Sequence, residues 1–143
     1  MLATSRATLL LALLLLQISA RDATSYQVVV HPENKLSSVE RKFLADVFLK
    51  KTTLWPNGEV VRPTDLDAGS LVRERFSQDI LGRTVAATKN YWQQMIFSGR
   101  DLPPPEFETD DAVIKYVLKF PGAVGYVSGN ANLGAAKILA VKP

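Results

Sequence analysis

The sequence has 143 residues, but it contains no cysteine and only one histidine, His31. Without cysteine the chain has no disulfide bond and no lipid anchor on an N-terminal cysteine, so its core alone must stabilise the fold. Zinc sites are built from clusters of cysteine and histidine, which this sequence lacks. There is also no glycine-rich nucleotide-binding motif, and we expect neither a metal nor another cofactor.

The catalytic motifs of hydrolases are missing as well. Ser70 lies in the stretch Ala68–Val72, whereas a nucleophile elbow has glycine two residues before and two residues after its serine. His31 precedes a proline, and nothing in the sequence places it near Ser70. The acidic residues from Glu106 to Asp111 surround a predicted helix start, where capping explains them without a calcium loop. We therefore expect that the protein is not an enzyme.

Charge of one sign is not concentrated anywhere along the chain. Lysine and arginine number 17 against 14 aspartates and glutamates, and both signs are interspersed. Binding to nucleic acid depends on a basic patch or stripe, which this pattern does not provide. We therefore expect no nucleic-acid partner.

A single long apolar run lies near the N-terminus. Arg6 precedes it, the run covers Leu9 to Leu16, and small residues follow up to Ala20. This three-part pattern is typical of a secretory signal peptide, and the run is shorter than the ~20 residues that span a bilayer. An uncleaved anchor is the alternative. We expect a signal peptide over residues 1–20, a domain over residues 21–143 with no membrane span after cleavage, and a periplasmic or secreted location.

The rest of the sequence alternates β-branched strands with amphipathic helices. The continuous apolar run Tyr26–Val30 is typical of a strand that is covered on both faces, as in parallel sheets. This order predicts an α/β domain with a mostly parallel sheet of about four strands flanked by helices. The predicted strands are 26–30, 59–65, 123–127 and 137–141, the predicted helices are 37–51, 70–81, 84–99 and 109–120, and the predicted core includes Phe43, Phe48, Phe76 and Val124.

The stretch Asp65–Phe76, DLDAGSLVRERF, is the candidate functional site. A helix N-terminus offers free N–H groups and partial positive charge to an anion. Gly69 would let the backbone approach the anion, Ser70 would donate a hydroxyl, and Arg73 would supply a mobile guanidinium that matches phosphate oxygens. The alternative is that Ser70 or Asp67 only caps the helix, and the nearby aspartates favour it because they repel anions.

Four segments resemble the phosphate-binding proteins of bacterial phosphate ABC transporters, which have the type II periplasmic-binding-protein fold. The family has a valine-rich strand followed by a helix, then a strand that leads into Gly-Ser-Gly-Thr and a helix, and later a Pro-Gly-Ala-Ile-Gly-Tyr-Val phrase. The matching segments are VVVHPEN (28–34), SSVERKFLADVFLKKTTLWPNG (37–58), VVRPTDLDAGSLVRERF (60–76) and AVIKYVLKFPGAVGYV (112–127).

This resemblance implies one lobe of that fold and an exported solute-binding domain. Phosphate or a similar oxyanion would be the ligand, held by Gly69, Ser70 and Arg73, and an ABC permease or another envelope protein would be the partner. Two departures lower the expected affinity: Leu71 and Val72 replace the family's last glycine and threonine, and the second lobe that would close over the anion is missing. The alternative is a scaffold lobe that has lost its ligand and serves as a protein- or envelope-interaction module. An unrecognised hydrolase is a third class.

Overall fold

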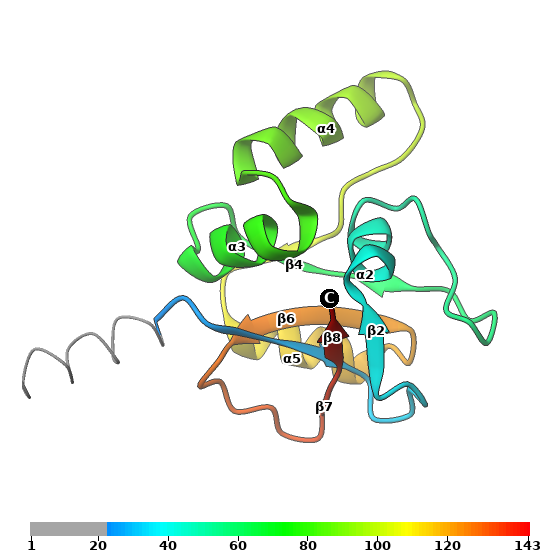
Figure 1. Cartoon of the computed structure of the whole chain (residues 1–143), viewed down its shortest axis with the longest axis vertical. Coiled ribbons are helices and arrows are strands. Elements are labelled where there is room, and N and C mark those ends of the chain that lie inside the picture. Colours follow the sequence, from blue (N-terminus) through cyan, green and yellow to red (C-terminus); the bar gives the residue numbers. More distant parts are fainter. Residues whose placement is uncertain (1–22) are drawn as a thin grey trace, which may run out of the picture.

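The computed structural model describes residues 23–143, and Figure 1 shows how their helices and strands are arranged. The expected signal peptide, residues 1–20, lies outside the described residues. Within the described part of the chain, no helix combines the length and the apolar character that crossing a bilayer requires. The elements are β1 (Tyr26–Val30), β2 (Ser38–Glu40), α2 (Arg41–Phe48), β3 (Arg62–Pro63), β4 (Asp65–Leu66), α3 (Leu71–Phe76), the π-helical turn η1 (Ser77–Leu81), α4 (Val85–Phe97), β5 (Glu106–Phe107), α5 (Asp110–Lys119), β6 (Ala123–Ser128), β7 (Lys137–Ile138) and β8 (Ala140–Lys142).

A four-stranded sheet with the order β3-β6-β1-β7 forms the centre of the domain. The α/β class, the four strands and the flanking helices are confirmed. The expectation of a mostly parallel sheet is wrong, because β1 runs antiparallel to both β6 and β7 and only β3 runs parallel to β6. The apolar run of β1 indicated a strand covered on both faces, and such burial does not require a particular strand direction.

Helices cover both faces of this sheet (Figure 1). Consecutive residues of a strand point to opposite faces, so Gly125 and Tyr126 of β6 identify what lies on each side. A Cβ atom at Gly125 would meet the side chains of Val113 and Val117, which belong to α5. The ring of Tyr126 stacks on Phe76 of α3, with ring centroids 3.8 Å apart. The domain is therefore a sandwich of helix, sheet and helix layers.

Three of the four residues predicted in the core are buried. Phe48, Phe76 and Val124 are at most 2% exposed. Phe43 is only partly buried and packs against Trp55, with ring centroids 5.8 Å apart. The predicted stripe of α2 therefore holds for Phe48, whereas Phe43 lies at the edge of the core.

The first predicted helix begins later than expected, at Arg41. Residues Ser38–Glu40 form β2, which pairs in parallel with β8 near the end of the chain. Glu40, rather than a serine at the predicted start, is the N-cap of α2, and it makes no side-chain cap bond. Ser37 instead accepts a hydrogen bond at its carbonyl from the Ala140 N–H at 3.0 Å. Pairing with a distant strand outweighs the local helical pattern of this segment.

Two predicted strands are each divided into shorter strands. Segment 59–65 contains β3 and the start of β4, and segment 137–141 contains β7 and the start of β8. Pro63 is the last residue of β3, at the edge of the sheet, where a missing backbone donor is tolerated. The predicted loop from Arg100 to Glu108 contains β5, which pairs in parallel with β4. This pairing brings the loop beside the candidate site.

Candidate functional site

The turn Asp67–Ser70 connects β4 to α3 at the carboxyl end of β4. Ser70 is the N-cap of α3, and its Oγ accepts a hydrogen bond from the Arg73 N–H at 3.2 Å. The Ser70 N–H donates to the Asp67 carbonyl oxygen at 3.1 Å. The capping alternative is therefore confirmed for Ser70. Its hydroxyl hydrogen is still free to rotate toward another acceptor.

Gly69 lies exposed in this turn, and its N–H group faces a carboxylate of the chain itself. The N–H donates to Oδ2 of Asp67 at 3.3 Å. A Cβ atom at Gly69 would lie 3.4 Å from the same oxygen, which is an ordinary contact. Space alone therefore does not require glycine here. The Asp67 charge lies where an incoming anion would approach, and like charges at this range repel.

Arg73 is buried in the described structure, with only 4% of its side chain exposed. Its Nη1 donates to the Leu66 carbonyl oxygen at 2.8 Å and to Oε1 of Glu106 at 2.7 Å. Its Nη2 lies 3.8 Å from Oδ2 of Asp65. The expectation of a mobile guanidinium is therefore wrong, because β5 brings Glu106 against it and the carboxylate of Asp65 lies beneath it. Burial acts to lower the pKa of Arg73, but Asp65 and Glu106 outweigh it and raise the pKa.

Asp65 joins this ion pair to the centre of the sheet. The Tyr126 hydroxyl donates to Oδ1 of Asp65 at 2.7 Å and accepts from the Leu66 N–H at 3.3 Å. Burial raises the pKa of Asp65, while Arg73 and the bond from Tyr126 act to lower it. Burial, followed by the neighbouring Asp65 charge, also raises the pKa of the Tyr126 hydroxyl. The buried network thus fixes the start of α3 to β4, β5 and β6.

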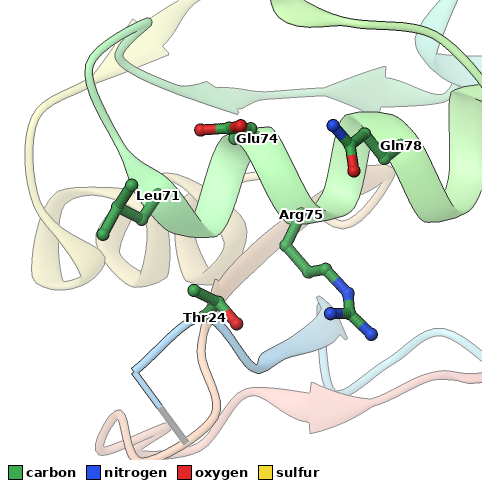
Figure 2. Close-up of a pocket in the computed structure, with 5 residues that line it drawn as sticks. All are labelled: Thr24, Leu71, Glu74, Arg75 and Gln78. Carbon is green, nitrogen blue, oxygen red and sulfur yellow. The ribbon is translucent and has the colours of Figure 1, made fainter. Parts of the chain in front are cut away.

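A shallow hollow of about 230 Å³ lies along the outer side of α3. Figure 2 shows Leu71, Glu74, Arg75 and Gln78 on one side of it and Thr24 on the other. Arg75 is the cation of this hollow, but its Nε donates to Oδ2 of Asp79 at 3.0 Å. Glu74 adds a negative charge on the same helix.

The charges around the turn are therefore mostly acidic or compensated. Asp65, Asp67, Glu74 and Glu106 surround it, and Arg73 is paired with two of these carboxylates. The turn can therefore offer an anion only uncharged hydrogen-bond donors. The N–H groups in the first turn of a helix, as in α3, have no carbonyl oxygen within the helix to which they can donate. Such donors can hold a small oxyanion weakly, and the carboxylates oppose it.

The remaining chemistry of the described residues is sparse. Among residues 23–143, no group of three or more histidines, cysteines, aspartates or glutamates is arranged to hold a metal ion. His31 lies directly after β1, and its Nδ1 accepts a hydrogen bond from the Glu33 N–H at 3.1 Å. This local bond gives His31 a role in its own turn.

The sequence did not reveal the partners of Arg73. Glu106 follows three prolines in a segment that reads as a loop, and Tyr126 reads as an ordinary core residue of a strand. A buried arginine requires compensating carboxylates. This rule predicts acidic partners for Arg73 only once its burial is known, and the sequence does not indicate that burial. The one available signal was the closely spaced acids Asp65 and Asp67 beside the arginines of the helix.

Comparison with known proteins adds information on the fold. No protein-family model and no curated protein sequence matches the chain. Similar solved structures include one assigned as a phosphate ABC transporter substrate-binding protein from Clostridium perfringens, solved with bound phosphate (TM-score 0.62, 16% identity, 81% of this chain and 44% of that chain). An ABC-type phosphate transport receptor from Vibrio cholerae is equally similar (TM-score 0.62, 16% identity, 81% and 45%).

PstS from Borrelia burgdorferi is also similar, with a TM-score of 0.61 and 14% identity over 82% of this chain and 47% of that chain. The chain therefore spans less than half the length of these structures. Identities this low show the fold alone. Together with the four-stranded sheet and its flanking helices, these matches show that the chain has the fold of one lobe of a periplasmic-binding-protein-like structure.

Proposed function

We propose that this domain binds phosphate or a similar oxyanion weakly at the turn Asp67–Ser70, as an exported domain of the solute-binding type. The observation that carries the proposal is the position of this turn. It follows the carboxyl end of β4 and begins α3, and ligands of open α/β sheets bind at strand carboxyl ends. The fold is shared with a Clostridium perfringens structure that holds phosphate.

The residues proposed to contact the anion differ in what they can contribute. Gly69 and the first turn of α3 would contribute backbone N–H groups, and Ser70 would contribute its hydroxyl hydrogen. Arg73 would act indirectly, by holding the start of α3 in place, because its Nη atoms already contact Leu66, Glu106 and Asp65. We expect a dissociation constant on the order of 1 mM, which corresponds to about −4 kcal/mol.

Export belongs to the same proposal. Signal cleavage after Ala20 would release a domain over residues 21–143 to the periplasm or the exterior, where an ABC permease or another envelope protein would be its partner. N-terminal sequencing of the exported protein tests this step. A mature protein that still begins at Met1 would contradict it.

A second function, that of a scaffold lobe without a ligand, is favoured by one specific observation. The only buried arginine among residues 23–143, Arg73, is compensated by Asp65 and Glu106 within the chain. Arg73 is therefore not free to pair with a charged ligand. In this alternative the lobe would contact another protein or the envelope, and the network would serve only to hold α3.

A phosphate titration followed by backbone amide NMR distinguishes the two functions. At low salt, the amide signals of Gly69 to Arg73 should shift and saturate in the millimolar range, and more salt should weaken the effect because the site is open. The variant Asp67→Asn should bind phosphate several-fold more tightly, since it removes the carboxylate 3.3 Å from the Gly69 N–H.

The variant Asp111→Asn provides the matched control. Asp111 is an exposed acid in the first turn of α5, so the change removes the same charge at another helix start. It should leave the phosphate shifts at Gly69 to Arg73 unchanged. Signals of that turn that stay unmoved up to tens of millimolar phosphate, in both the unmodified protein and Asp67→Asn, would refute binding and leave the scaffold function.

A further inference from the structure

The carboxyl-terminal end of α4 carries an unusually exposed apolar surface. Phe97 is 89% exposed, Leu102 in the following loop is 65% exposed, and Ile96 is 48% exposed. We call these three residues the α4 tip. Figure 1 shows that this end of α4 and the loop after it lie at the outer edge of the domain, away from the sheet. A large aromatic side chain that is almost fully hydrated in the free protein gains free energy when a partner covers it.

The side of α4 that carries Thr88 and Trp92 attaches the helix to the domain. Trp92 is 5% exposed and Thr88 is 3% exposed. The Tyr91 hydroxyl donates to the Leu49 carbonyl oxygen at 2.7 Å, and Oγ1 of Thr88 lies 3.4 Å from Oγ of Ser77. The helix is therefore held along one stripe, and the exposure of the α4 tip follows from the way the helix is docked.

The charges next to the α4 tip are basic. Between Asp79 and Asp101 the chain has no acidic residue, and it has three cations, Arg83, Lys89 and Arg100. Lys89 and Arg100 are exposed, and Lys89 lines the same hollow as Ile96. Lys89 and Ile96 therefore lie on one side of the helix, and Arg100 follows the end of α4 at Phe97.

The nearest acids do not cancel this charge. Asp101 lies 3.5 Å from Nζ of Lys50, and Glu106 is paired with the Arg73 guanidinium at 2.7 Å. Lys51, which is exposed, follows Lys50 directly. The surface around the α4 tip thus combines protruding apolar side chains with Lys89 and Arg100, which form no ion pair among residues 23–143.

We propose that the α4 tip docks on the surface of an anionic lipid bilayer. Phe97, with Ile96 and Leu102 beside it, enters the boundary between headgroups and acyl chains, while Lys89 and Arg100 contact the lipid phosphates. This is the arrangement of interfacial helices, which combine an apolar face with flanking lysine and arginine. The helix lies on the bilayer and does not cross it. This role does not depend on anion binding at the turn Asp67–Ser70.

The shape of the α4 tip favours the lipid surface over an acidic protein, since both partners would match the same cations. The apolar residues are few and protrude at the end of one helix, and they are flanked by cations rather than enclosed in a polar rim. A protein interface of stable size buries about 800 Å² on each partner around a largely flat apolar centre. A single protruding aromatic residue with neighbouring cations suits insertion between headgroups better.

A tryptophan placed at the α4 tip tests the proposal directly. The two native tryptophans, Trp55 and Trp92, are 3% and 5% exposed, so a tryptophan introduced by Phe97→Trp reports its own surroundings. With vesicles of phosphatidylglycerol and phosphatidylcholine, its emission should shift to the blue, and lipids brominated in the upper acyl chain should quench it. The purified protein is used, and the tryptophan at position 97 reports on its own surroundings.

The matched control is Leu54→Trp, which introduces a probe at an apolar residue that is 50% exposed elsewhere on the domain. Its emission should not respond to vesicles. In the Phe97→Trp protein, replacing Lys89 by glutamine should weaken vesicle binding about five-fold, the factor for ~1 kcal/mol per basic side chain at an anionic surface. Added salt should weaken it further.

Two results would overturn the proposal. The first is an emission of the Phe97→Trp protein that stays unchanged with millimolar anionic lipid at low salt, which would leave an acidic protein as the occupant of the α4 tip. The second is equal quenching of the probes at positions 54 and 97, which would show that the protein contacts vesicles without this orientation.

Discussion

The replacement Arg73→Met tests whether the buried network at the candidate site stabilises the fold. Methionine fills much of the same space but removes the charge and both guanidinium bonds. The Asp65 carboxyl, whose side chain is 10% exposed, then loses its cation, and breaking a buried ion pair from one side costs about 3–5 kcal/mol. Glu106 is 43% exposed, so water hydrates its carboxylate and it adds little to this cost.

The pH dependence of the variant's stability provides a second test of the buried ion pair. Burial already raises the pKa of Asp65, and Arg73 is the first of the groups that oppose this rise. Without Arg73 the folded-state pKa of Asp65 therefore rises further above its unfolded value. A group shifted in this direction contributes stability below its unfolded pKa and loses that contribution as pH increases through the folded pKa. The penalty of Arg73→Met should thus be smaller at about pH 4 than at neutral pH.

Urea unfolding of the variant and the unmodified protein at both pH values measures these effects. Arg75→Met is the matched control, because Arg75 is 56% exposed and its pair with Asp79 lies on the surface. Its replacement should lower the free energy of unfolding much less than Arg73→Met does, because water hydrates both partners of the surface pair. Equal losses for Arg73→Met and Arg75→Met would refute the structural role of the buried pair. If Arg73→Met does not fold, Arg73→Lys replaces it in the same comparison. Lysine keeps the positive charge but lacks the planar guanidinium group.

Three further predictions concern two residues of the core and the pKa of Tyr26. Gly125→Ala should lower the free energy of unfolding by about 1–3 kcal/mol in urea titrations, because its Cβ would lie 2.8 Å from Cγ1 of Val113; an unchanged midpoint would show that α5 can move away from the sheet. Tyr126→Phe should cost about 1–3 kcal/mol, since Asp65 loses a buried donor at 2.7 Å, and a neutral result would mean that water replaces the hydroxyl. Burial, with a neighbouring carboxylate, raises the pKa of Tyr26 to about 12; NMR of its ring signals should find this value, and an ordinary tyrosine pKa would contradict the packing of β1.

Local sequence signals predicted the helices well. The helix expected over residues 84–99 forms over Val85–Phe97, and the helix expected over residues 109–120 forms over Asp110–Lys119 with Thr109 as its N-cap. The helix expected over residues 70–81 also ends at Leu81, and Gly82 follows it in the left-handed conformation with φ 65°. These features depend on side chains within one turn of each other, so the sequence contains them directly.

Strand pairing could not be predicted in the same way. The sequence identified the buried strand Tyr26–Val30, but not that its neighbours would be antiparallel. It gave a helix where Ser38–Glu40 forms a strand against the end of the chain. The hydrophobic pattern of a segment records which faces are buried, whereas direction and partner depend on residues about a hundred positions away.

The candidate site shows the same difference between local features and long-range contacts. Local sequence signals placed the turn and the start of the helix after it and limited the cap to Ser70 or Asp67, because each depends on contacts within a few residues. The tertiary structure alone decided the state of Arg73, since β5 brings Glu106 to 2.7 Å from it and β6 brings Tyr126 to Asp65. A charge that looks free in the sequence is compensated in the fold, because a buried guanidinium is stable only where distant carboxylates meet it.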